Sequence, residues 1–135
     1  MASWLLKTEP GAYSFADLVR DKRAVWDGIR NPEARKNLGL AKKGDLVLVY
    51  HTGDERSVVG LAKVTRTAYP DPADDAWTAI DIAPLRALVQ PVSLSALKAE
   101  KKLADFALIR RGRLSVVPVA DAELALILVL GKTRL

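Results

Sequence analysis

The amino-acid sequence predicts an α+β fold: a bent, mixed β barrel of about five or six short strands, with four or five short helices around it. Two features of the chain predict this fold. Its apolar, β-branched segments are short and contain glycines, which favours bent strands over the parallel sheet of βαβ units. Residues that cap helices recur between these segments. With 135 residues and no linker or repeat, the chain is expected to form a single domain, 1–135.

The N-terminal part predicts a strand and then a short helix. The strand covers Ser3–Leu6 and is stopped by Pro10. Ser14 and Asp17 have the spacing of a capping box, so a helix should follow and end near Arg20. The side chains expected to face the core from this helix are those of Phe15, Leu18 and Val19.

A second helix is marked at both of its ends. Asn31 is a good N-cap, Pro32 suits the first helical position, and Glu33 places a carboxylate in the first turn. The helix should run to about Leu38 and end at Gly39.

The middle of the chain is typical of β structure. The expected strands are Asp45–His51, Ser57–Thr67, Trp77–Ile82 and Leu85–Val92. Gly60 marks a bend or a bulge in the second of these strands. The segment Tyr69–Pro72 contains two prolines and is expected to break the strand into a loop.

The C-terminal part predicts more helices and one more strand. The expected elements are a helix from Ser93 or Ser95 to about Lys102, a helical turn over 104–109, a strand at Arg113–Val117 closed by Pro118, and a last helix capped by Asp121 and ending at Gly131. The apolar run in this last segment fits a strand or a helix. Its caps and its Ala and Leu content decide for a helix.

The composition excludes several kinds of chemistry. The chain has no cysteine, which removes disulfides, thiolate metal sites and cysteine nucleophiles. His51 is the only histidine, so no ordinary zinc site is expected, and a Ser–His–Asp hydrolase would need His51 as its base. No metal or cofactor is therefore predicted. The apolar run Leu124–Leu130 is far shorter than the roughly 20 residues of a membrane span. Because a signal peptide is also absent, we expect a soluble, cytoplasmic protein with no membrane partner.

The positive charge is concentrated in two segments. The net charge is +5, and residues 20–43 contain eight basic and three acidic side chains. Residues 98–113 contain six basic and two acidic side chains. If the fold brings the two segments together, they form a patch that attracts phosphate; if not, they are ordinary solvated surface. Arg30 and Arg35 could instead form ion pairs with Asp27 or Glu33.

Two segments place polar side chains beside large apolar ones near the start of the chain. Along the strand that ends in Lys7, Thr8 and Glu9, alternation puts Lys7 and Glu9 on one face and Thr8 on the other. The segment 26–37 combines Trp26 with Arg and Asn side chains, a set that stacks on a base and reads its edge. The structural alternatives are an exposed strand end, a core tryptophan and a capped helix.

Two further segments have the same mixed character. The buried strand in the middle of the chain ends in Tyr50, His51 and Thr52, and a lone histidine there is more often structural than catalytic. The segment Arg110–Ser115 is a basic turn before a strand, which could contact phosphate or form plain surface.

Linked motifs then occur in order along nearly the whole chain. They are WLLKTEP at 4–10, YSF at 13–15 with Asp17 and Leu18, WDGIRN at 26–31 with Ala34, Arg35 and Asn37, GD at 44–45, YHT at 50–52, VG at 59–60, YPD at 69–71, RLSV at 113–116 and PV at 118–119. In this combination the chain resembles the EVE domain family. The resemblance implies a PUA-like fold, in which a bent β pseudo-barrel carries helices. It also implies a relation to the YTH domains, which hold a modified base in an aromatic pocket.

The function that this resemblance implies is non-enzymatic binding of DNA or RNA that carries a modified base, with modified cytosine as the leading candidate. The base would be flipped into a pocket, which costs a few kcal/mol, and aromatic stacking would return about 1–3 kcal/mol. The residues implied to form the pocket are Lys7, Thr8, Glu9, Trp26, Arg30, Asn31, Tyr50, His51 and Thr52. The candidates for phosphate contacts, from the two basic segments, are Arg35, Lys36, Asn37, Arg110, Arg111 and Arg113.

The chain departs from the family pattern at three places. Thr8 and Thr52 stand where many relatives have Ser, so each hydroxyl is kept and a methyl group is added. Pro32 stands where an aromatic residue often follows the Asn. The loop after Asp71 is shorter than in many members.

Two alternative functions remain open from the sequence. Some related PUA-like domains hydrolyse an acylated cytidine with a Thr, a Lys and a Glu, and Lys7, Thr8 and Glu9 supply these residue types. A regular strand, however, points Thr8 away from the other two. The second alternative is a protein-interaction domain with a vestigial pocket. The sequence does not define the oligomeric state.

Overall fold

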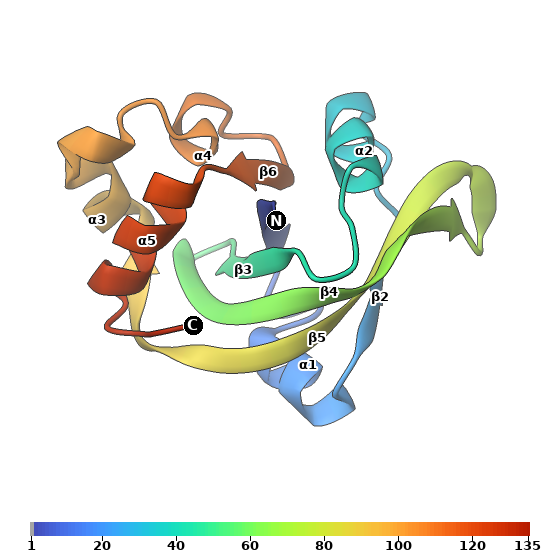
Figure 1. Ribbon diagram of the computed structural model, residues 1–135, viewed down its shortest axis with the longest axis horizontal. Helices are drawn as coiled ribbons and strands as arrows, with labels where there is room; N and C mark the ends of the chain where they lie inside the picture. The colour runs from blue at the N-terminus through green and yellow to red at the C-terminus, as the bar shows by residue number, and fades with distance from the viewer. Residues whose placement is uncertain (1) are drawn as a thin grey trace.

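The computed structural model describes residues 2–135, and its strands form one six-stranded mixed sheet. The strands are β1 (Ser3–Thr8), β2 (Ala24–Trp26), β3 (Leu46–His51), β4 (Ser57–Asp71), β5 (Asp74–Ser93) and β6 (Val116–Val119), in the order β2-β5-β4-β3-β1-β6. β1 is parallel to β3 and antiparallel to β6. The long strands β4 and β5 curve around the core (Figure 1). The predicted α+β class is thus confirmed.

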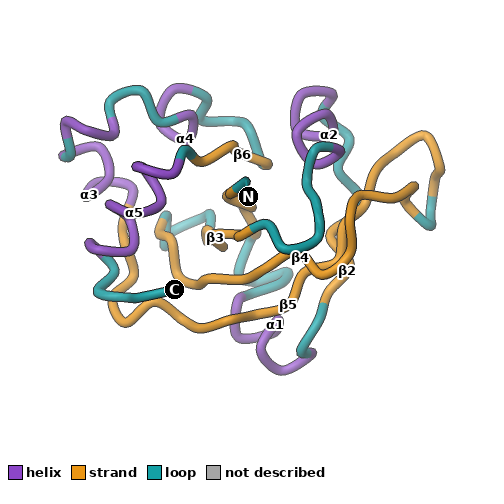
Figure 2. The backbone as a smooth tube through the Cα atoms, viewed as in Figure 1, coloured by secondary structure: helices purple, strands orange, loops and turns teal. Residues whose placement is uncertain are grey.

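Short helices surround this sheet (Figure 2). They are α1 (Phe15–Asp21), α2 (Pro32–Gly39), α3 (Leu94–Ala99), a 3-10 turn (Lys101–Leu103), α4 (Ala107–Arg110) and α5 (Asp121–Leu130). Within residues 2–135, no helix is both long and apolar enough to cross a membrane.

The predicted helix caps are largely confirmed. The Ser14 hydroxyl accepts the Asp17 N–H, and the Asp17 carboxylate accepts the Ser14 N–H, so the capping box of α1 is complete. Asn31 Oδ1 accepts the Ala34 N–H at the start of α2. For α5 the N-cap is Ala120 rather than Asp121, and the Glu123 carboxylate accepts the Ala120 N–H.

Gly60 bends β4 as predicted, because the register between β4 and β5 shifts between Val58 and Gly60. The tertiary structure adds a second reason for glycine at this position. A Cβ atom on Gly60 would lie 2.3 Å from the ring of Phe15. Only glycine therefore lets α1 pack its first side chain against this strand.

Several predicted boundaries are wrong. β4 continues through Tyr69 and Pro70, which pair with Ala79 and Thr78, so residues 69–71 are strand and only Pro72 of the expected loop lies in a turn. The strands expected at Trp77–Ile82 and Leu85–Val92 are parts of the single strand β5. Pairing across the hairpin overrides the local effect of the prolines.

Two other expectations also fail, and the structure contains one strand that was not expected. Pro118 lies inside β6, which is an edge strand and can accommodate a residue without an N–H. Val19 does not face the core, since 52% of its surface is exposed. Strand β2 was not expected at all, because three residues are too few to show alternation.

Candidate functional site

A hollow of about 300 Å³ opens beside the end of β2. Its lining residues are Thr8, Tyr13, Ala24, Val25, Trp26 and Asp27, and we call it the Trp26 hollow. The rings of Tyr13 and Trp26 meet edge to face, with their centroids 6.2 Å apart and their planes at 75°. Trp26 is 9% exposed, so most of the ring is packed in the core. The hollow therefore has an aromatic wall formed by Tyr13 and by the small exposed part of Trp26.

The wall formed by Tyr13 is held by polar contacts. The Thr8 hydroxyl donates to the Tyr13 carbonyl oxygen at 2.6 Å, which joins β1 to the segment before α1. The Tyr13 hydroxyl donates to Asp21 at 2.9 Å. Burial and then this bond to Asp21 raise the pKa of Tyr13 to about 12. The hydrogen bond to Asp21 and the edge-to-face contact with Trp26 together hold the Tyr13 ring in place.

The rim of the hollow is fixed by Asp71, which sequence reasoning did not single out as a site residue. Its carboxylate accepts the N–H groups of Gly28 at 3.0 Å and Ala73 at 2.8 Å. The Gly28 N–H, followed by that of Ala73, lowers the pKa of Asp71. Gly28 has φ +71°, a conformation that favours glycine. The turn after Trp26 is thus anchored to the end of β4.

A second hollow of about 550 Å³ lies between the start of α2 and the turn before β6. It is lined by Asn31, Pro32, Glu33 and the range Arg110–Leu114, and we call it the basic cleft. The two basic segments of the sequence thus meet here in part. Arg20 on α1 and Lys98 on α3 lie on other parts of the molecule (Figure 1). The cleft receives only some of the basic side chains.

The predicted phosphate contacts differ in their surroundings. Arg111 forms an ion pair with Glu33 across the cleft. Arg110 also lines the cleft, and its guanidinium donates to Ala104 O and to Asp105. Asn37 donates to Val116 O and so ties α2 to β6. The remaining candidates are Arg35 and Lys36, which lie on α2 outside the cleft lining, and Arg113, which lines the cleft.

The possible ion pairs of Arg30 and Arg35 with nearby carboxylates do not form. Glu33 pairs with Arg111, which is 78 residues away in the chain. Arg30 lies over the ring of Trp77, with its guanidinium carbon 4.5 Å from the ring centroid. The side chain is thus held at the β4–β5 hairpin and not at the Trp26 hollow.

Lys7 connects β1 to the basic cleft. Its ammonium group donates to Gly112 O at 2.9 Å and lies 5.9 Å from the centroid of the Tyr50 ring. Burial lowers the pKa of Lys7. Tyr50 itself is buried beside β1, where it pairs in register with Lys7. Lys7 therefore holds the Arg110–Leu114 turn against the sheet.

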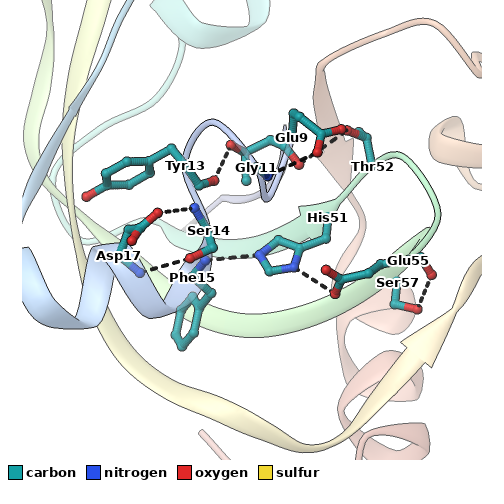
Figure 3. A network of polar contacts seen from close by, with 11 residues as sticks. Glu9, Gly11, Tyr13, Ser14, Phe15, Asp17, His51, Thr52, Glu55 and Ser57 are labelled. Atoms are coloured by element: carbon teal, nitrogen blue, oxygen red, sulfur yellow. Dashed lines mark hydrogen bonds and ion pairs between the residues drawn. The ribbon is translucent and has the colours of Figure 1, made fainter.

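Three of the predicted pocket residues form a separate network (Figure 3). His51 is buried; its Nε2 atom accepts the Phe15 N–H at 3.0 Å, and its Nδ1 atom lies 3.0 Å from Glu55. Since Nε2 is an acceptor, the ring proton on Nδ1 is donated to Glu55. The Glu9 carboxylate accepts the Gly11 N–H and the Thr52 hydroxyl. We call this group the Glu9–His51 network.

The structure therefore does not bring the nine predicted pocket residues into one hollow. Thr8 and Trp26 line the Trp26 hollow, together with Tyr13 and Asp27, which were not predicted. Asn31 lines the basic cleft, and its side-chain oxygen is occupied as a helix cap. Tyr13 stood next to the predicted capping box, and only its contact with Trp26 shows that it lines a site.

The molecule is thus a small α+β domain with a bent six-stranded sheet, an aromatic-walled hollow and a separate basic cleft. The chain belongs to the EVE domain family, whose model matches residues 2–130.

Relatives cover nearly the whole chain. Thymocyte nuclear protein 1 of Mus musculus is 30% identical, over 97% of this chain and 74% of that protein. A protein of Rhodopseudomonas palustris solved by NMR has 38% identity and a TM-score of 0.93, over 98% of this chain and 94% of its own. Human thymocyte nuclear protein 1, crystallised in complex with DNA containing 5-methylcytosine, has 26% identity and a TM-score of 0.91 over 100% of both chains.

Proposed function

We propose that this chain is a non-enzymatic module that binds nucleic acid carrying a modified base, and that a modified cytosine in DNA occupies the Trp26 hollow. The observation that carries the proposal is the aromatic wall of Tyr13 and Trp26 in a hollow of about 300 Å³. A relative with the same fold over the whole chain has been crystallised with 5-methylcytosine DNA, which supports the same class of ligand for this chain.

The hollow offers the two kinds of contact that a flipped base needs. Stacking on an aromatic ring contributes about 1–3 kcal/mol, of the same order as the cost of unstacking the base. Asp27 lines the rim, and a carboxylate suits the exocyclic amine of cytosine. The Thr8 hydroxyl donates its hydrogen to the Tyr13 carbonyl oxygen. Its own oxygen keeps lone pairs that can accept a second hydrogen bond. Asp27 thus supplies the carboxylate of the hollow, whereas the carboxylate of the predicted pocket residue Glu9 is engaged in the Glu9–His51 network.

The basic cleft is placed to contact the backbone of the same nucleic acid. Trp26 lines the hollow and Asn31 lines the cleft. Trp26 and Asn31 are five positions apart in the chain, so their Cα atoms are separated by at most about 17 Å, which equals the rise of about five base pairs. A strand whose base enters the hollow can therefore place a nearby phosphate at the Arg110–Leu114 turn. Such contacts position the nucleic acid and carry no sequence information.

The hydrolase alternative needs Lys7, Thr8 and Glu9 to act on one bond. Their polar groups instead have three separate partners, which are Gly112 O, Tyr13 O and the Gly11 N–H. The observed contacts do not direct these three groups at one bond, so we expect no hydrolysis. Turnover of an acetylated cytidine would contradict the proposal of a binding module.

The test compares duplexes that differ in a single central cytosine, which is unmodified, 5-methylated or 5-hydroxymethylated, with single-stranded DNA and RNA versions beside them. We expect wild type to prefer a modified base and Trp26→Ala to lose this preference, since the stacking surface is gone. Trp77→Ala is the matched control, because it removes a tryptophan outside the hollow. Unfolding curves show which variants fold. A folded Trp26→Ala protein that keeps the preference, or equal affinity of wild type for all bases, would contradict the proposal.

A further inference from the structure

The two walls of the basic cleft are joined by an ion pair between Glu33 and Arg111. Glu33 belongs to the first turn of α2, and Arg111 follows α4 directly. The Arg111 side chain is 57% exposed and the Glu33 side chain 39% exposed, so both remain in contact with solvent. The pair thus lies across the opening of the cleft, and no buried charge would be stranded if it broke.

Glu33 is the only acidic residue that lines the cleft in the described part of the chain. The other charged lining residues are Arg110, Arg111 and Arg113. Arg110 pairs with Asp105, which does not line the cleft, and within residues 2–135 Arg113 forms no ion pair. Of the three arginines in the lining, Arg111 is therefore the one that is bound to a carboxylate of the cleft itself.

We infer that Arg111 binds a backbone phosphate and that Glu33 is its internal competitor, which must be displaced when nucleic acid enters the cleft. The inference rests on the proposed function and specifies how the charged part of that site is regulated. Glu33 lowers the affinity that comes from backbone contacts alone, which do not depend on sequence. Tight binding then requires the additional contacts of a base in the Trp26 hollow.

The exchange is physically reasonable because both states satisfy Arg111. A guanidinium binds carboxylate and phosphate with the same planar donor geometry. An exposed ion pair contributes about 1 kcal/mol or less, so a phosphate can displace Glu33 at small cost. Removing the carboxylate while keeping the shape of the side chain should therefore raise affinity by up to about fivefold, which corresponds to that 1 kcal/mol.

The experiment is a double-mutant cycle with an unmodified duplex and its 5-methylcytosine counterpart as probes. We expect Glu33→Gln to raise affinity for both duplexes by a similar factor, because the backbone is common to them. Arg111→Gln should lower both affinities and reduce the slope of log K against log salt by about 1. In the Arg111→Gln background, Glu33→Gln should have no further effect. Asp75→Asn, at an exposed position outside the cleft lining, makes the same change in net charge and should have little effect.

Each outcome decides between competition and a purely structural ion pair. If the pair only holds α2 against the turn, Glu33→Gln will lower the unfolding midpoint and weaken binding. If Glu33→Gln also raises the affinity in the Arg111→Gln background, or if Asp75→Asn raises it as much, the inference is wrong. The increase would then be a general effect of net charge. The unmodified duplex tests the competition even if wild type shows no preference for a modified base. A wild-type protein without preference for a modified base would contradict only the proposed function, and not the competition between Glu33 and phosphate.

Discussion

The Trp26 hollow and the Glu9–His51 network both include residues at the end of β1, yet they differ in how their polar atoms are engaged. In the network, both ring nitrogens of His51 and both oxygens of Glu9 have partners within the protein. In the hollow, an aromatic wall and the Asp27 side chain border open space. The comparison teaches that a pocket is identified by unused surface and not by residue type. Substitutions in the two regions should therefore separate stability from recognition.

The largest effect on stability is expected for His51→Ala. It removes the acceptor of the buried Phe15 N–H, and an unsatisfied buried donor costs on the order of 1–3 kcal/mol. We expect a fall of about this size in the free energy of unfolding, measured by urea denaturation. Binding by the folded protein should keep its base preference.

The matched control for His51→Ala is Glu55→Gln. It alters only the contact at Nδ1, where Glu55 is half exposed, and should change stability by less than about 1 kcal/mol. If the folded His51→Ala protein lost its base preference, His51 would belong to the recognition site. The two regions would then not separate stability from recognition.

A change at Asp71 should affect both properties at once. Asp71→Asn places an amide NH₂ where two backbone N–H groups now find acceptors, so the rim of the hollow should loosen and affinity should fall. The lowered pKa of Asp71 means that its ionised form stabilises the fold above the ordinary carboxyl range, near 3.8. This contribution is lost as the pH falls through the lower folded-state pKa.

Measured by thermal unfolding across pH, the difference in stability between wild type and Asp71→Asn should be largest near neutral pH and shrink below about pH 4. A difference that does not vary with pH would show that the Asp71 charge contributes nothing to the rim. Asp74→Asn, at the exposed start of β5, is the control for the loss of one carboxylate.

The smallest effects are expected for the two threonines. Thr8→Ser removes a methyl group from the lining of the hollow, so the affinity ratio between hydroxymethyl- and methylcytosine should shift toward the larger group. One methylene is worth about 1–3 kcal/mol at most in such discrimination. Thr52→Ser should leave the ratio unchanged, because the Thr52 hydroxyl contacts Thr8 O and Glu9 outside the hollow. Binding titrations with the three duplexes test this, and a shift caused by Thr52→Ser alone would contradict the assignment.

The elements that the sequence predicts well are those with local signals. The helix caps at Ser14 and Asn31 and the bend at Gly60 depend on residues within a few positions of each other, and all three are confirmed. The loop expected at Tyr69–Pro72 fails because hairpin pairing outweighs the local preference of proline. For the site, the sequence singled out Trp26, which lines the hollow, while the two basic segments meet only in part, at the basic cleft. The roles of Tyr13 and Asp71 were not predicted.

By itself, the sequence determined the fold class, the family and the residue types available for binding, because alternation, capping and motif order are properties of the chain. Only the tertiary structure decided which of these groups are free to bind a ligand. The partner that engages His51 lies 36 positions away, the one that engages Gly28 lies 43 away, and the one that engages Arg111 lies 78 away. A donor hydrogen that is already in a hydrogen bond cannot bind a ligand without losing its partner, and such partners are set by packing and not by neighbours in the chain.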